Sequence, residues 1–437
     1  SNNIKCGNSL IGPDYFTGKL FPDEEELRRI NPFDWRSEFP EAIGAGGFDC
    51  VIGNPPYSAK QSLETKLLAN FFTSIEYKCD PYAFFVEQGL RKLNSNGMLG
   101  YIIPVTWMTN FYYQKLRELL IVKSRSLHRV VLIDGLVFIG ANVDTCLIFL
   151  SNHGNLQNGF EWSRTTPYNI NAPTVMRSYE SILSEERLAI APDADAAWAQ
   201  IKAKADNLSC RLDSLAKISL GMKLRTNDEF ISRERNDSHP DPICFGDDIS
   251  RYAPIIPSRF FHFQEAIIIG GTKRPEIHRA KPKIFIQAIR NLSLKRRIVA
   301  TLDPKGICFV GTVNGVTLLK DEVDILYLLG LINSNFLNVY FRKRFTTISL
   351  TAAFLGALPI PQIDKTIITD KAHHDHMMAL VGQMLDLQQR YKRITGELEK
   401  QQTQRSIEEI NKQIDILVYE LYNLTPEEIE IVEADSK

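Results

Sequence analysis

The chain has 437 residues, of which 44% are hydrophobic, 24% charged and 10% aromatic, and its formal net charge is −1. This length and composition predict two or three folded domains and exclude a disordered, collagen-like or low-complexity protein. No apolar run approaches the roughly 20 residues that a membrane helix needs. Seven cysteines are scattered without a CxxC pair, which predicts reduced thiols in a cytoplasmic protein and neither a disulfide framework nor a zinc site.

The first 150 residues alternate short apolar runs with stretches of helical periodicity. Residues 48–53 (Phe-Asp-Cys-Val-Ile-Gly) are followed by two prolines, which predicts a buried strand, with Cys50 in the core, that ends in a rigid loop. The pattern predicts further strands at 98–105, 129–133 and 143–150. Strands that alternate with helices predict a parallel α/β sheet covered on both faces. Such sheets bind ligands at the carboxyl ends of their strands.

The rest of the chain divides into three parts. Residues 151–210 are polar and then helical, which predicts a connector after a first domain at 1–150. Residues 211–362 hold many short apolar runs between Gly, Pro, Asn and Asp, which predicts a mixed α/β domain. Within it, residues 324–341 are expected to form one amphipathic helix. Residues 363–437 form a helical segment with two long helices between 371 and 422.

The most informative stretch is Asn54-Pro55-Pro56-Tyr57, directly after the first predicted strand. Two prolines fix φ and remove two backbone donors, so the loop offers the Asn54 side-chain carbonyl and free backbone carbonyls as acceptors. A stiff set of acceptors suits the binding of an NH2 group, and Tyr57 adds an aromatic face for a planar ring. The alternative is a tight proline turn that only ends a strand, and it is disfavoured for the full pattern.

Residues 48–57 resemble motif IV of the amino-methyltransferases, in the NPPY version of the DNA adenine-N6 methyltransferases. Other motifs follow in the order of the gamma group: Gly7-Asn8-Ser9-Leu10 resembles motif III, Asp80-Pro81-Tyr82 motif V, residues 93–107 motif VI and residues 137–148 motif VIII. Residues 211–362 resemble the TaqI-like C-terminal specificity domain, and residues 414–422 resemble the closing helix of Type IIG restriction–modification enzymes.

The resemblance implies a partial Rossmann-like methyltransferase domain, followed by a mixed α/β target-recognition domain and C-terminal helices. It implies adenine-N6 methylation of double-stranded DNA in a restriction–modification system, with the target adenine flipped out of the duplex. Asn54, Pro55, Pro56 and Tyr57 would form the catalytic loop, and Tyr57 and Phe138 would stack on the base. Hydrogen-bond acceptance by Asn54 and by the Pro55 carbonyl would make the adenine amine more nucleophilic.

The resemblance also implies S-adenosylmethionine as the cofactor, contacted by Asn8 and Asn54. The Gly-rich cofactor loop of the family should lie upstream of motif III, and nothing before Asn8 can supply it. We therefore expect the downstream part of a longer enzyme with an incomplete cofactor site, and the missing N-terminal part as a partner. No metal is expected, because the cluster at residues 373–376 scatters its histidines around a helix start.

The balanced charge hides two basic clusters. Residues 271–300 hold nine Lys and Arg against one acid, and residues 342–344 read Arg-Lys-Arg. A basic run alone is as often a solvated surface, but in a domain that resembles a specificity domain phosphate contacts are favoured. The acidic stretch from Thr425 is expected to point away from DNA. The candidate DNA contacts are Lys223, Arg225, Lys273, Arg274, Lys295, Arg296, Arg297, Arg342 and Arg344.

Two other functions stay open. The chain fits a DNA-binding specificity module that recognises a sequence but does no chemistry by itself, a function that the missing cofactor loop favours. It also fits methylation of RNA or protein, because the NPPY sequence occurs in such enzymes as well. The large domain that resembles the TaqI-like specificity domain argues against this last function.

Overall fold

The structure is a computed structural model, and it describes residues 3–17, 23–57, 68, 71–74, 79–135, 137–138, 143–153, 158–167, 169, 172–191, 196–225, 230–291, 294–319, 323–345 and 347–436. By its contacts the chain divides into two compact units, Ser1–Pro192 and Asp193–Lys437, called unit 1 and unit 2 below.

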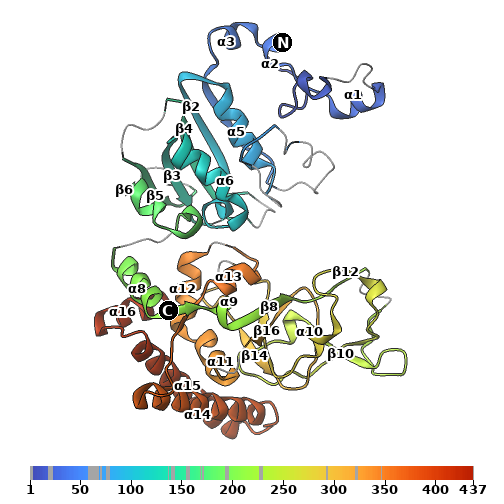
Figure 1. Ribbon diagram of the computed structural model, residues 1–437, viewed down its shortest axis with the longest axis vertical. Helices are drawn as coiled ribbons and strands as arrows, with labels where there is room; N and C mark the ends of the chain where they lie inside the picture. Colours follow the sequence, from blue (N-terminus) through green and yellow to red (C-terminus); the bar gives the residue numbers. More distant parts are fainter. Residues whose placement is uncertain are drawn as a thin grey trace. The chain divides into compact units, whose positions relative to one another are not determined.

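Unit 1 is built on a six-stranded sheet with the strand order β1-β2-β4-β3-β5-β6 (Figure 1). The strands are β1 (Phe48–Gly53), β2 (Leu93–Pro104), β3 (Leu127–Ile133), β4 (Thr145–Ser151), β5 (Gly159–Thr165) and β6 (Thr174–Ser178). β1 runs parallel to β2 and β3 parallel to β5, whereas β4 is antiparallel to both of its neighbours. The predicted all-parallel sheet is therefore a mixed sheet. The connection from Ile133 to Thr145 is shorter than the crossover of about a dozen residues that a parallel pair needs.

Two helical segments between the strands cover the same face of this sheet (Figure 1). α5 (Tyr82–Lys92) buries Phe84, Val86 and Leu90 at helical spacing in the core of unit 1. α6 (Gln114–Arg117) continues into a π-helical turn at Glu118–Lys123. The remaining helices and 3-10 turns of unit 1 are Pro13–Phe16, α1 (Glu24–Ile30), α2 (Trp35–Glu38), α3 (Pro40–Gly44), Val105–Met108, Phe111–Tyr113, α7 (Tyr179–Leu183) and Glu186–Leu188.

β1 is an edge strand that pairs with β2 alone among the described residues. Its Cys50 is exposed and Ile52 is 80% exposed, whereas Phe48 and Val51 are half-buried. The prediction of a buried strand with Cys50 in the core was therefore wrong. Apolar strands of α/β sheets are normally covered on both faces, so the exposure of Cys50 and Ile52 on one face of β1 is an unusual feature of this unit.

The first unit extends beyond the boundary that we expected at residue 150. β5 and β6 complete its sheet, and Phe160, Trp162 and Tyr179 are buried in the same core as the earlier strands. Only the later part of the predicted connector, from α8 (Ala196–Asn207) on, belongs to unit 2. The polar composition of this stretch therefore reflects its edge position and not a linker.

The described residues of unit 2 form four small sheets. The largest is antiparallel, with the order β14-β13-β16-β8, and the others pair β11-β10-β15, β12-β9 and β17-β7. The strands are β7 (Ser209–Arg211), β8 (Ala216–Leu220), β9 (Lys223–Leu224), β10 (Asp241–Cys244), β11 (Phe260–Phe261), β12 (Ile268–Gly270), β13 (Lys283–Gln287), β14 (Ala300–Asp303), β15 (Cys308–Phe309), β16 (Val313–Leu318) and β17 (Pro359–Pro361).

The helix that we expected at residues 324–341 is two helices. The chain becomes extended at Ser334, whose hydroxyl accepts a hydrogen bond from Leu337 N and caps the second helix. The helices and 3-10 turns of unit 2 are α8, α9 (Leu212–Leu215), Gly246–Asp248, Glu265–Ile267, α10 (Pro275–Arg279), α11 (Ile325–Asn333), α12 (Asn335–Arg344), α13 (Ala352–Gly356), α14 (Ile368–Tyr391), α15 (Glu397–Leu421) and α16 (Pro426–Ser436).

The two long C-terminal helices that the sequence predicts are confirmed as α14 and α15, which pack against each other. α15 buries Ile407, Ile414, Leu417 and Val418 along one face. Over the described part of the chain, every helix is too short or too polar to cross a bilayer.

Candidate active site

The NPPY loop follows β1 at the carboxyl end of the strand. Pro55 is buried, whereas Asn54 and Pro56 are exposed. In the sheet register Gly53 lies opposite Tyr101 of β2, so the loop lies beside the last residues of that strand. The side-chain amide of Asn54 makes no hydrogen bond to the described residues, and its Oδ1 is therefore available to a ligand. The buried proline anchors the loop while the amide stays at the surface.

Two aromatic rings from distant parts of the chain meet at this loop. The rings of Tyr57 and Phe138 lie edge to face, with centroids 6.0 Å apart and an interplanar angle of 66°. The Tyr57 hydroxyl donates a hydrogen bond to the Ile102 carbonyl of β2 at 3.4 Å. Burial, and next the nearby Cys146, raise the pKa of Tyr57 to about 12. Tyr57 is therefore a neutral donor and an aromatic surface, and it is no base.

A buried polar network supports the same edge of the sheet from the start of α5. The Tyr113 hydroxyl donates to Asp80 Oδ2 at 2.6 Å and accepts from Asp80 N at 3.0 Å. The Tyr82 ring stacks on Tyr113 with centroids 5.2 Å apart, and its hydroxyl lies 3.0 Å from Thr106 Oγ1. Burial raises the pKa of the Asp80 carboxyl, against the hydrogen bond from Tyr113. The network ties the start of α5 to the segment that follows β2.

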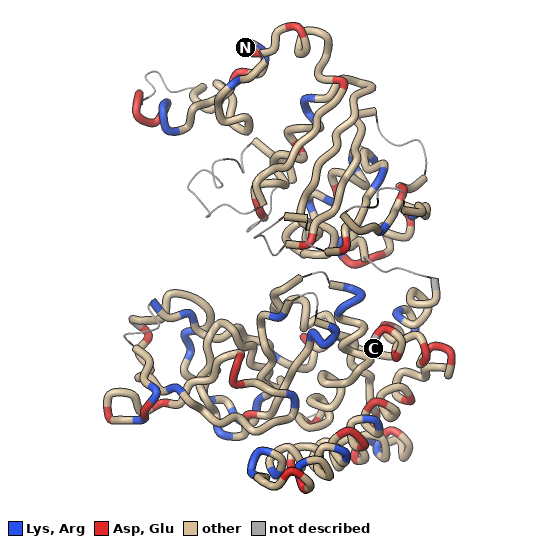
Figure 2. Tube along the Cα trace, turned by 180° about the vertical axis from the view of Figure 1, so that it is seen from behind, with Lys and Arg blue, Asp and Glu red and all other residues tan. Residues whose placement is uncertain are grey.

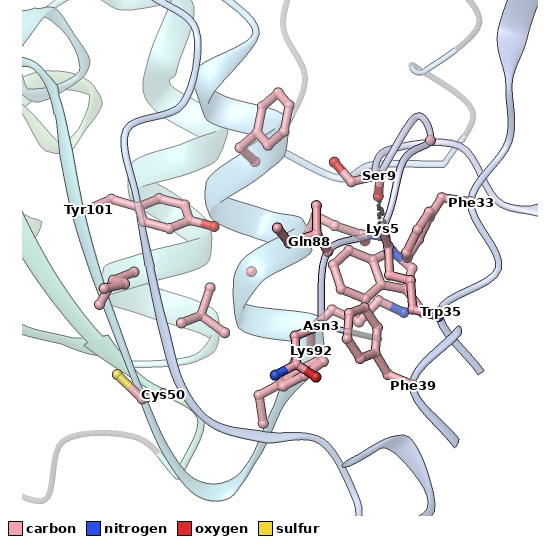
Figure 3. Close-up of a pocket in the computed structure, with 17 residues that line it drawn as sticks. Asn3, Lys5, Ser9, Phe33, Trp35, Phe39, Cys50, Gln88, Lys92 and Tyr101 are labelled. Carbon is pink, nitrogen blue, oxygen red and sulfur yellow. Dashed lines mark hydrogen bonds between the residues drawn. The ribbon is translucent and has the colours of Figure 1, made fainter. Parts of the chain in front are cut away.

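A hollow of about 580 Å³ runs along β1 and α5. Figure 3 shows Phe33, Trp35 and Phe39 on one side of it, and Tyr101 and Cys50 on the other. Its polar lining includes Ser9 and Gln88. Ser9 is fixed because its carbonyl accepts hydrogen bonds from Trp35 Nε1 at 3.1 Å and from Gln88 Nε2 at 2.9 Å. Lys5 and Lys92 also line the hollow, and its size and its aromatic side chains fit a planar organic ligand.

Asn8, the predicted cofactor contact, is half-buried in the loop next to this hollow. Its side-chain Oδ1 accepts a hydrogen bond from Leu10 N at 3.2 Å, and its backbone N–H donates to the Asn31 carbonyl at 2.6 Å. Asn8 therefore shapes the loop that presents Ser9. Sequence reasoning missed Trp35 and Gln88, because their role depends on contacts that no local pattern contains.

The predicted DNA contacts divide into exposed and buried groups. Lys and Arg are spread over both units (Figure 2). Exposed side chains are those of Lys223, Arg225, Lys273, Arg274 and Lys295. Four of these lie on or beside one short ribbon, because β9 pairs with β12 and residues 273 and 274 follow β12. We call residues 223–225 and 268–274 the basic ribbon.

The structure corrects the prediction that Arg297 contacts DNA. Its side chain is fully buried, and its guanidinium donates to the carbonyls of Arg290 and Thr347. Its backbone N–H donates to Asn338 Oδ1 at 2.6 Å. Arg296 is half-buried and donates to the Asn333 carbonyl, and burial lowers its pKa to about 10. Arg297 thus serves the fold and is not available to a phosphate.

The second basic cluster is also engaged within unit 2. Asp435 of α16 pairs with Arg342 at 3.1 Å and with Lys343 at 2.6 Å. Arg344 donates to the Tyr340 hydroxyl at 2.7 Å. The acidic C-terminal helix therefore contacts the basic cluster, so its acids do not all point away from the predicted DNA-binding residues.

The predicted histidine cluster at residues 373–376 lies in the first turns of α14. His374 is buried, its ring stacks on Tyr327 with centroids 5.1 Å apart, and Nδ1 lies 3.2 Å from Asp375 Oδ1. Within the described ranges no three His, Cys, Asp or Glu side chains converge as metal ligands.

Comparison with known proteins identifies both parts of the chain. Residues 2–138 match the Eco57I restriction–modification methylase family, and residues 241–360 match the TaqI-like C-terminal specificity domain. A putative type II restriction enzyme and methyltransferase of Methanocaldococcus jannaschii is 26% identical over 361 residues, covering 77% of this chain. The type II restriction enzyme and methyltransferase RM.Eco57I of Escherichia coli is 31% identical over 162 residues, covering 35% of this chain.

Solved structures show the same fold. The Type IIL restriction–modification enzyme MmeI in complex with DNA matches with a TM-score of 0.59 at 13% identity, covering 92% of this chain and 58% of that chain. The DrdV–DNA complex matches with a TM-score of 0.51 at 11% identity, covering 90% of this chain and 48% of that chain.

The chain carries an Eco57I-type methylase domain and a TaqI-like specificity domain, and it is homologous to type II restriction–modification methyltransferases. It spans 29% of the length of the M. jannaschii protein and 15% of that of the E. coli enzyme.

Proposed function

We propose that the chain methylates adenine N6 in double-stranded DNA, as part of a restriction–modification system. The observation that carries this proposal is the exposed Asn54 amide at the end of β1, beside the contact between Tyr57 and Phe138. An adenine flipped from the duplex would lie against the two rings. Because the target atom is inside a base pair, such a site needs an aromatic surface as well as hydrogen-bond acceptors.

Asn54 and Pro55 would act on the exocyclic amine. The lone pair of that amine is delocalised into the ring, so the amine is a weak nucleophile. Acceptance of its two hydrogens by Asn54 Oδ1 and by the Pro55 carbonyl would keep electron density on nitrogen, and the rigid proline pair holds both acceptors in place. Tyr57, a neutral donor bound to the Ile102 carbonyl, would orient the ring and take no proton.

The hollow along β1 fits the planar adenosine end of S-adenosylmethionine. The aromatic side chains Phe33, Trp35 and Phe39 would enclose the ring, and Ser9 and Gln88 supply polar groups. Asn8 would support this wall, and Asn54 would lie toward the reacting end. When bound, the cofactor supplies an electrophilic methyl group. We propose that further polypeptide completes this side of the site, and the exposed apolar side chain of Ile52 on β1 supports this.

Two other functions give different results in one assay. The open edge of β1 also favours a DNA-binding module that does no chemistry by itself, and this module would bind DNA without methyl transfer. A methyltransferase for RNA or protein would label those substrates instead. We expect labelled S-adenosylmethionine to modify duplex DNA, with no transfer when RNA or protein is the acceptor. Transfer to RNA or protein alone would contradict the proposal.

The basic ribbon is expected to bind DNA phosphates. Replacing Lys273 and Arg274 by alanine should weaken binding to every sequence. It should also make the negative slope of log K against log salt less steep by about 1 to 2, because about 0.9 fewer counterions are released for each phosphate contact that is lost. Fluorescence anisotropy at several salt concentrations measures this slope.

The matched control for the ribbon is the double variant Lys365→Ala and Lys371→Ala, which also removes two positive charges, from exposed positions just before and within the first turn of α14. It should leave the slope unchanged. An unchanged slope in the ribbon variant as well would place the ribbon off the DNA path.

Arg297→Ala should instead destabilise unit 2, because the carbonyls that Arg297 binds would lose their donor.

A further inference from the structure

Unit 2 contains a second hollow, of about 410 Å³, that the proposed chemistry does not use. It lies between the turn at residues 237–239 and the segment at residues 262–267. Phe230 and Ile267, which belong to a small hydrophobic cluster around β9, β10 and β12, form its apolar part. Its rim carries the polar side chains of Asp237, Ser238, His239, His262 and Gln264. We call this site the polar hollow.

The rim side chains are held in place but keep free polar groups. His239 Nδ1 lies 3.0 Å from Asn236 Oδ1, and His239 N donates to the Asn236 carbonyl at 3.0 Å, which closes a tight turn. Gln264 Nε2 lies 3.5 Å from His262 Nδ1, at the limit of a hydrogen bond. The Nε2 atoms of both histidines and the side-chain Oε1 of Gln264 make no hydrogen bond in the described part of the chain, whereas the Gln264 backbone carbonyl accepts one from Ile267 N at 3.3 Å. The rim therefore presents oriented donors and acceptors to solvent.

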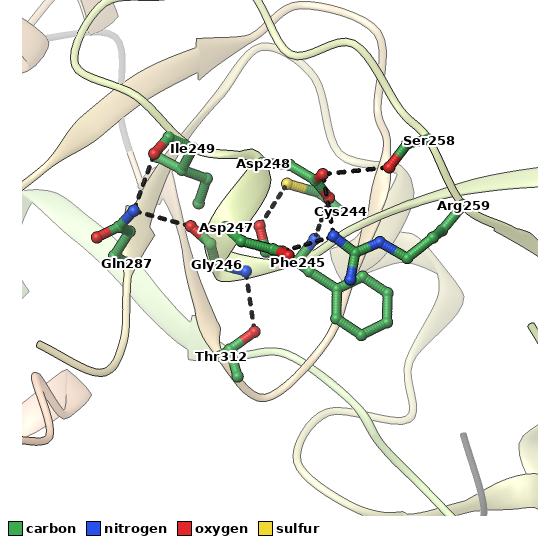
Figure 4. Close-up of polar contacts among 10 residues, drawn as sticks. All are labelled: Cys244, Phe245, Gly246, Asp247, Asp248, Ile249, Ser258, Arg259, Gln287 and Thr312. Carbon is green, nitrogen blue, oxygen red and sulfur yellow. Dashed lines mark hydrogen bonds and ion pairs between the residues drawn. The ribbon is translucent and has the colours of Figure 1, made fainter. Parts of the chain in front are cut away.

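Arg259, a few residues before the rim segment at 262–267, is the centre of a group of ion pairs that we call the clamp (Figure 4). The Arg259 guanidinium pairs with Asp247 at 2.6 Å and with Asp248 at 3.2 Å, and it lies 3.9 Å from the centre of the Phe245 ring. The next residue, Phe260, exchanges two backbone hydrogen bonds of 2.8 Å with Ser232. The clamp thereby fixes the loop that leads to the rim. A rigid support is what a site for specific recognition requires.

The basic ribbon adjoins the polar hollow. Arg225 N donates to the carbonyl of Ile267 at 2.9 Å, so the ribbon begins at the apolar part of the hollow. At its other end Gly271 has a φ of +71° and packs so tightly that a Cβ atom would lie 1.9 Å from the Gly221 carbonyl oxygen. Only glycine permits this close approach. The ribbon is thus anchored at both ends, with its charged side chains exposed.

We propose that the polar hollow reads base edges of duplex DNA while the basic ribbon holds the adjoining phosphates. This inference rests on the proposed function. Amide, hydroxyl and carboxylate side chains are among those that distinguish base pairs by hydrogen bonding, together with Arg and Lys, and imidazole nitrogens offer similar donors and acceptors. Lys and Arg on a neighbouring element supply affinity that does not depend on sequence. The polar hollow therefore determines specificity, and Gln264 and His239 are its central residues.

The test separates specificity from affinity. The chain is used to select preferred duplexes from a random library, and the selection is repeated with Gln264→Ala. We expect the variant to lose preference at one or two positions and to bind the original site roughly 5- to 150-fold more weakly, with an unchanged salt slope. Gln264 is exposed and contacts only His262 among the described residues, so the variant should fold. His239→Ala, checked by circular dichroism, is the second variant.

Lys273→Ala is the matched control, and it should weaken binding to all sequences alike while the selected sequence stays the same. Selection of the parent sequence by both Gln264→Ala and His239→Ala would overturn the inference and leave the proposed function intact. A parent chain that binds DNA without any preference would also overturn it. A parent chain that does not bind duplex DNA would overturn the proposed function, and the inference with it.

Discussion

Replacing Asn54 by alanine is expected to lower methyl transfer by roughly 10²- to 10⁴-fold while DNA affinity stays within a factor of about two. The exposed amide makes no hydrogen bond to the described residues, so its removal should not disturb β1 or the anchored Pro55. The loss arises because one of the two acceptors for the amine hydrogens disappears. Turnover of labelled cofactor is the measurement, with this chain and with the chain extended upstream.

Asn96→Ala is the matched control for this experiment. Asn96 is also an exposed asparagine, but it lies near the beginning of β2, at the end of the strands opposite the NPPY loop. Its loss should leave turnover unchanged. Full turnover in Asn54→Ala would rule out the catalytic assignment, and a parallel loss of DNA affinity would mean that Asn54 binds DNA without acting on the amine.

Asp303→Ala is expected to destabilise unit 2 by about 3–5 kcal/mol, because it leaves a buried ammonium without a counter-charge. Asp303 and Lys283 are both fully buried, and Oδ2 lies 2.6 Å from Nζ. Asp303 also accepts hydrogen bonds from the backbone of Lys305, Gly306 and Ile307 and so closes the turn after β14. Urea unfolding measures the change in the free energy of unfolding.

The comparison for this prediction is Asp213→Ala, which breaks an exposed pair. Asp213 lies 2.7 Å from Arg211, and both side chains are nearly half exposed. Solvent screening limits such pairs to about 1 kcal/mol or less. A cost of Asp303→Ala no greater than that of Asp213→Ala would show that the buried pair is not a principal support of unit 2.

Sequence patterns correctly predicted the elements that depend only on residues close together in the chain. The apolar run of β1, the two prolines after it and the periodicity of α5, α14 and α15 all lie within short windows of sequence. The meeting of Tyr57 and Phe138 followed from the family resemblance, and the structure places the two rings together. Their roles in base stacking stay a prediction.

Features that depend on distant contacts were missed or wrong. Arg297 stands in the most basic stretch of the chain, yet Asn338 and Thr347, 41 and 50 residues further on, hold it in the core. Cys50 and Ile52 lie two residues apart on one face of β1, and their exposure depends on what covers that face. Hydrophobicity predicts that a strand forms but does not tell which strands flank it.

The central claim is that the NPPY loop methylates adenine in duplex DNA. The most direct measurement is transfer of labelled methyl groups into mixed-sequence duplex DNA, followed by digestion to nucleosides, with this chain alone and with the chain extended upstream. We expect label in N6-methyladenine, at least with the extended chain. Label in cytosine, or DNA binding without any label in either form, would contradict it.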